Sequence, residues 1–88
     1  MDGLKLKEVI NRYRYYFESE LIPSNKKSKI SSYNYGRLEH CYSMLDKMEK
    51  FIIEGRREKV FRWLGFIQGY LWSMDIYSLN DLKNHNRP

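Results

Sequence analysis

The stretch of sequence that decides the fold is KVFRWLGFIQGYLW, residues 59–72 of the 88-residue chain. Its apolar residues recur at spacings of three and four, which place their side chains on one face of an α-helix. One methionine beyond the stretch continues this stripe, which consists of Val60, Leu64, Ile67, Leu71 and Met74. We therefore predict a helix over residues 57–74.

Aromatic residues flank the stripe, so this helix is apolar on most of its surface. They are Trp63, Phe66, Tyr70 and Trp72. A helix that is apolar on most faces must be covered on most faces, and one short chain supplies few elements to cover it. We therefore expect a homo-oligomer, in which Phe66, Tyr70 and Trp72 pack between elements.

Gly65 and Gly69 share one face of the same helix, four positions apart. Each mid-helix glycine costs roughly 1 kcal/mol relative to alanine, so we expect a packing benefit that offsets this cost. Two interpretations are open. The glycines allow a second helix to cross closely, within the fold or across a dimer axis, or they leave room for large rings such as those of Trp63 and Tyr70.

A second helix precedes this one and is predicted over residues 33–54. Its stripe also steps by three and four and consists of Leu38, Cys41, Leu45, Met48 and Ile52. Gly55 stands where a helix C-terminal cap is expected. Because the connection to the third helix is short, the two helices should form an antiparallel hairpin.

Helices are also predicted at both ends of the chain. The first covers residues 4–22, with Asp2 as its N-cap and Pro23 ending it, and a basic loop follows over residues 23–32. A short helix over residues 78–84 starts with Ser78 and Asp81 in a capping-box arrangement and should place Leu79 and Leu82 on the core. Residues 85–88 should fray. The fold class is thus all-α, a single small helical bundle built on the hairpin.

Several chemistries are excluded by composition. No apolar run approaches the ~20 residues that span a bilayer, so no membrane span is expected. The lone Cys41 forms no intrachain disulfide and fits the cytoplasm. Cys41 and His40 are adjacent, so they point about 100° apart on a helix and do not chelate together. We expect no metal, no cofactor and no enzymatic activity.

The net charge of +5 comes mainly from two basic clusters, which should lie at opposite ends of the hairpin. Tyrosines stand beside the first cluster and a tryptophan beside the second, and basic residues interleaved with aromatic ones can bind phosphates and stack on bases. The candidate residues for a ligand or partner are Lys26, Lys27, Lys29, Tyr33, Tyr35 and Arg37 in the first cluster, and Arg56, Arg57, Arg62 and Trp63 in the second. The alternative interpretation is that the charge serves solubility and the rings cover the core.

RWLGFIQGYLW (residues 62–72), together with the Asn-Arg ending at Asn86 and Arg87, resembles a pattern in small, mostly uncharacterised proteins of tailed bacteriophages. The resemblance covers the chain from Leu38 onward. It implies a phage accessory protein that acts by binding rather than by turnover.

Three hypotheses for the function follow. The first is a non-enzymatic phage protein that binds and modulates a host protein or other host macromolecule, in host takeover or counter-defence. The second is a sponge that holds an anionic nucleotide signal at a subunit interface. The third is weak nucleic-acid binding by the basic segment of residues 26–37.

Overall fold

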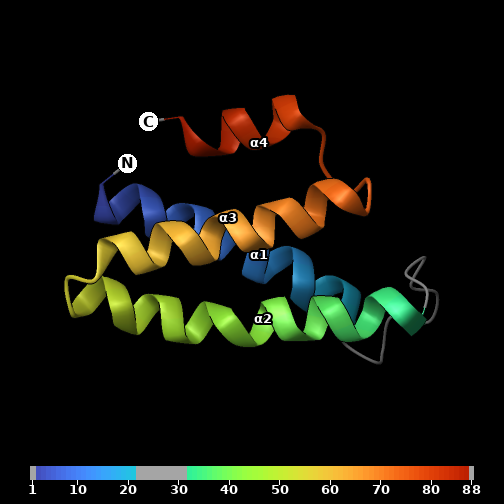
Figure 1. Cartoon of the computed structure of the whole chain (residues 1–88), viewed down its shortest axis with the longest axis horizontal. Helices are drawn as coiled ribbons and strands as arrows, with labels where there is room; N and C mark the ends of the chain where they lie inside the picture. Colours follow the sequence, from blue (N-terminus) through green and yellow to red (C-terminus); the bar gives the residue numbers. More distant parts are fainter. Residues whose placement is uncertain (1, 22–31, 88) are drawn as a thin grey trace.

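The computed structural model describes residues 2–21 and 32–87, and this part of the chain folds into helices (Figure 1). In chain order, the helices are α1 (Gly3–Leu21), α2 (Ser32–Ile53), α3 (Arg57–Ser73) and α4 (Leu79–Asn86). The predicted all-α class, with an N-terminal helix, a hairpin and a short C-terminal helix, is confirmed. The predicted loop over residues 23–32 lies almost wholly outside the described residues.

The α2–α3 hairpin forms the framework of the bundle, and α1 packs against it (Figure 1). The stripe residues of the three long helices meet in one apolar core. Those that are buried are Leu6, Val9, Ile10, Tyr13 and Phe17 of α1, Leu38, Cys41, Leu45 and Met48 of α2, and Val60, Leu64, Ile67 and Leu71 of α3. Burial of this apolar surface is the main stabilising contribution to the fold.

The predicted helix ends are present in the structure. Asp2 Oδ1 accepts a hydrogen bond from the backbone N–H of Lys5 at 2.8 Å, and Gly55 adopts the left-handed conformation at φ +77°. At the start of α4, Ser78 Oγ accepts from the Asp81 N–H and the Asp81 carboxylate accepts from the Ser78 N–H. These caps satisfy backbone groups that a helix end leaves unpaired.

Two expectations for the C-terminal segment are wrong. Residues 85 and 86 do not fray, because α4 continues to Asn86 and His85 is only 8% exposed. Leu82 is buried as expected, but Leu79 is 57% exposed. Each helical residue turns by about 100°, so an inward face centred on Leu82 and His85 leaves Leu79 at its edge.

The outer surface of α3 is left partly uncovered by the single chain. Phe66 is 45% exposed and Trp72 is 51% exposed, in keeping with the expectation that α3 carries more apolar surface than one chain can cover. Gly65 and Gly69 also face outward, and a methyl group built on either meets nothing within 4 Å. Of the two interpretations, a close helix crossing at these glycines is therefore absent among the described residues of the single chain. The homo-oligomer stays a prediction.

Candidate functional site

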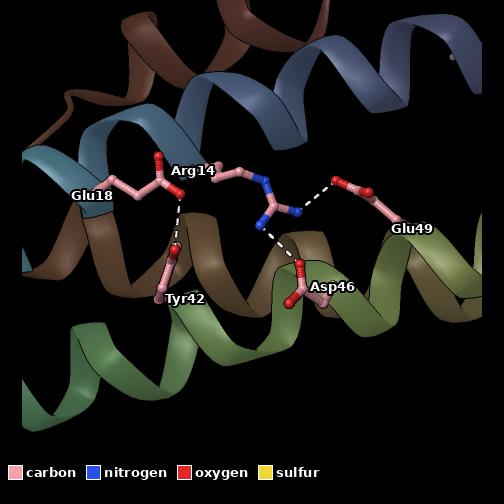
Figure 2. Close-up of polar contacts among 5 residues, drawn as sticks. All are labelled: Arg14, Glu18, Tyr42, Asp46 and Glu49. Carbon is pink, nitrogen blue, oxygen red and sulfur yellow. Dashed lines mark hydrogen bonds and ion pairs between the residues drawn. The ribbon is translucent and has the colours of Figure 1, made fainter.

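The two sides of α2 that flank its buried face carry different side chains. On the side that faces α1, Arg14 Nη1 donates to Asp46 at 2.8 Å and Arg14 Nη2 donates to Glu49 at 2.5 Å (Figure 2). One turn away, the Tyr42 hydroxyl donates to Glu18 at 2.8 Å. These carboxylates are thus used to attach α1 and do not face α3.

The side of α2 that faces α3 carries basic and aromatic residues instead. Together with Met44 they occupy positions 37, 40, 44, 47 and 51, and these spacings of three and four make a second stripe beside the core stripe. The Arg37 guanidinium lies 5.7 Å from the centroid of the Tyr70 ring, and the His40 and Phe66 rings lie 6.2 Å apart. Nearer the turn between the helices, Lys59 Nζ lies 4.7 Å from the centroid of the Phe51 ring.

A groove of about 390 Å³ opens between α2 and α3 along these residues. Met44, Trp63 and Phe66 give it an apolar surface, and His40, Lys47 and Arg62 are exposed beside them. The residues that define this α2–α3 groove are His40, Ser43, Met44, Lys47, Arg62, Trp63 and Phe66. None of these is an acid, and no carboxylate in the described part of the chain forms an ion pair with Lys47 or Arg62.

A second concave region, of about 440 Å³, lies at the turn between α2 and α3. It is lined by Gly55, Arg56, Arg57, Glu58, Lys59 and Arg62. Two carboxylates reduce its positive charge, because Glu58 is part of the lining and Glu54 lies 3.6 Å from the Arg56 guanidinium. The turn is therefore less uniformly basic than the α2–α3 groove.

The structure brings some of the predicted site residues together and separates others. Arg62 and Trp63 share the α2–α3 groove, Arg56 and Arg57 lie at the turn, and Arg37 lies toward the other end of the hairpin beside Tyr70. Lys26, Lys27 and Lys29 lie outside the described residues, as do the side chains of Tyr33 and Tyr35.

Sequence reasoning missed the contribution of α2 to this groove. His40, Ser43, Met44 and Lys47 line it, and three of these belong to the second stripe. The sequence does contain a signal for it. The second stripe has the same spacings of three and four as the core stripe, but it lies on a neighbouring face of α2 and includes basic residues.

Four polar side chains, two of them buried and two partly buried, form a cluster where α1, α3 and α4 meet. Tyr13 and His85 are joined through the Tyr13 hydroxyl and His85 Nδ1 at 2.8 Å, and Gln68 Nε2 donates to the same hydroxyl at 2.9 Å. Gln68 and Asn86 exchange two further hydrogen bonds. Burial raises the pKa of Tyr13 to about 12, so its hydroxyl stays protonated at neutral pH. The hydrogen bonds of this cluster connect α1, α3 and α4.

Groups that could carry catalysis are engaged in packing or are dispersed. Cys41 is buried in the core, and burial raises the pKa of its thiol to about 11, so it is a poor nucleophile. Within residues 2–21 and 32–87, no three His, Cys, Asp or Glu side chains are arranged to hold a metal ion.

Comparison with protein-family models, with curated proteins and with solved structures finds no match to this chain. None of the described helices is both long enough and apolar enough to cross a bilayer.

Proposed function

We propose that this protein acts by binding, without chemistry of its own, and that it captures another macromolecule in the α2–α3 groove. The observation that carries this proposal is the composition of the groove. It combines exposed aromatic surface with basic side chains that no described carboxylate pairs with. Partly exposed aromatic residues and arginine are enriched where proteins bind one another.

The resemblance of the C-terminal half to small tailed-bacteriophage proteins adds a context to this proposal. A phage accessory protein of this size would modulate a host component by occupying one of its surfaces. The proposed location is accordingly the cytoplasm of the infected cell, and the proposed partner is a host protein.

The proposal is tested by comparing which proteins are captured from a lysate by chains with an intact and with an altered groove. The wild-type chain, Phe66→Glu and Tyr15→Glu are immobilised in turn and exposed to the same bacterial lysate. Tyr15 is a matched control, because it is an aromatic residue 78% exposed on α1, away from the groove. We expect proteins that are retained by the wild type and by the Tyr15 variant and are lost with Phe66→Glu. Equal retention by all three chains would contradict the proposal.

A nucleotide sponge is the second candidate function, and the basic turn favours it. Arg56, Arg57, Lys59 and Arg62 line one concave region and could together bind phosphate groups. A bound nucleotide would raise the unfolding temperature of the protein. Screening of common nucleotides by thermal unfolding, with Arg57→Gln as the comparison, tests this candidate. No stabilisation by any nucleotide would exclude it.

A further inference from the structure

The α2–α3 groove is an unfilled position in the helical bundle. α1 packs on the side of α2 that carries Asp46 and Glu49 (Figure 2). The groove on the other side of α2 is lined by residues of α2 and α3 alone among the described helices. A helix laid in such a groove would complete a bundle of four long helices. Docking of an amphipathic helix in an apolar groove is a recurring mode of protein recognition.

The dimensions of this surface suit a short helix. The groove is lined by residues 40–47 of α2 and 62–66 of α3. At about 1.5 Å per residue its α2 side is about 10 Å long, which about two turns of a partner helix would cover. Met44, Trp63 and Phe66 would receive its apolar side chains.

The positive charge of the groove favours a negatively charged partner. Lys47 and Arg62 are exposed beside the apolar surface. His40 also lines the groove, with its ring centroid 6.2 Å from that of Phe66. No acid lines the groove in the described part of the chain. A partner helix with Glu or Asp on the flanks of its apolar stripe would pair with both cations, whereas a basic helix would meet like charge.

Single-stranded nucleic acid fits the same surface less well. Nucleic acid binding of this kind depends on bases that stack on open aromatic faces. Here Lys59 lies against the rings of both Phe51 and Trp63, and Arg37 lies against the ring of Tyr70. Phe66 and Tyr70 also contact each other edge to face, with ring centroids 4.8 Å apart, and this contact reduces the ring surface on which a base could stack.

We infer that the α2–α3 groove binds an amphipathic helix of a partner protein, and that this helix carries acidic residues on both sides of its apolar stripe. The inference rests on the proposed function and specifies its partner.

Two synthetic peptides of about 15 residues test it, since this length gives about four helical turns. The first has leucines at i, i+3, i+4 and i+7 flanked by glutamates, and the second has lysine in place of every glutamate. Fluorescence anisotropy of each labelled peptide gives its affinity for three chains: the wild type, the groove variant Lys47→Glu/Arg62→Glu, and the control Lys7→Glu/Lys83→Glu. The control carries the same change in net charge at exposed residues of α1 and α4. Circular dichroism verifies that all three chains are folded.

We expect the acidic peptide to bind the wild type and the control with similar affinity, and to bind the groove variant about tenfold more weakly or worse. The basic peptide should bind the wild type more weakly than the acidic one. Equal affinity of the acidic peptide for the control and the groove variant would overturn the inference. So would groove-dependent binding of a mixed-sequence single-stranded oligonucleotide without binding of the acidic peptide, or self-association, seen by light scattering, that Phe66→Glu abolishes. Either of these last two results leaves capture by the groove standing, whereas the proposed function fails only if the lysate experiment shows no groove-dependent capture.

Discussion

The hydroxyl of Tyr13 in α1 lies 2.8 Å from Nδ1 of His85 in α4, although the two residues are separated by 72 positions in the sequence. The same hydroxyl accepts a hydrogen bond from Gln68 of α3, so one oxygen atom of α1 joins both α3 and α4. The contact therefore fixes the short C-terminal helix on the bundle through a buried and fully paired polar group.

Replacement of Tyr13 by phenylalanine removes this hydroxyl, which leaves the buried His85 Nδ1 without a partner and the partly buried Gln68 Nε2 with Asn86 alone. We expect Tyr13→Phe to lower the free energy of unfolding by about 1–3 kcal/mol, because unpaired buried polar groups lose their hydration without compensation. Tyr15→Phe is the control, since Tyr15 is exposed on the same helix. Urea unfolding followed by circular dichroism measures both. Equal midpoints for the two variants would show that the cluster adds no stability.

The stability of the protein should depend on pH through His85. Burial lowers the pKa of His85 below its ordinary value of 6.5, Arg12 and Lys5 lower it further, and Asp81 opposes them. The unfolded chain therefore binds this proton more readily than the folded chain does. We expect stability to be highest above about pH 6.5 and to fall as the pH drops toward the pKa of the folded state.

Urea midpoints between about pH 5.5 and pH 7.5 measure this dependence, a window below which carboxylates also titrate. His85→Gln should flatten the curve over this window, whereas His40→Gln, at an exposed position of α2, should keep it. A pH dependence that is unchanged in the His85 variant would assign the effect to another group.

Cys41 should react slowly with alkylating reagents in the folded protein. Burial raises the pKa of its thiol from 9.0 to about 11, which reduces the thiolate fraction at neutral pH about 100-fold, and the core also blocks access. We expect iodoacetamide to modify Cys41 at least about 100-fold more slowly in buffer than in concentrated urea. Similar rates in the two conditions, measured by mass spectrometry, would contradict the buried placement of this residue.

Replacement of either outward glycine of α3 by alanine should increase the stability of the protein. Because an added methyl group meets nothing within 4 Å at Gly65 or Gly69, each alanine variant should gain about 0.5–1 kcal/mol of stability from helix propensity alone. Gly55→Ala is the contrasting control, since φ is +77° there and alanine should destabilise. A loss of stability in Gly65→Ala would instead place a second helix against this face, as in the homo-oligomer that the apolar surface of α3 suggests.

Much of the fold could be predicted from the sequence, because helix periodicity and capping are local signals. The stripe from Val60 to Leu71 identifies the buried face of α3, and Gly55 and Ser78 mark helix ends that the structure contains. The C-terminal helix was harder to predict. His85 is polar and stands near the chain end, and only the position of Tyr13, far away in sequence, explains why it is buried.

The candidate site was predictable only in part. Arg62 and Trp63 could be named because a basic residue stands beside a large ring. Lys47 could not, because on sequence alone it belongs to a charged helix with neighbouring acids. Its place in the groove depends on the rotation of α2 about its axis, which turns Asp46 and Glu49 toward Arg14 of α1 and leaves Lys47 on the other side.

Selection of acidic helices by the α2–α3 groove can be tested by reversing the charge of the groove. The affinities of the glutamate and lysine peptides are compared on the wild type and on Lys47→Glu/Arg62→Glu. If the groove selects its partner by charge, the wild type should bind the glutamate peptide more tightly and the variant should bind the lysine peptide more tightly. An unchanged preference in the variant, with its fold intact, would contradict the account.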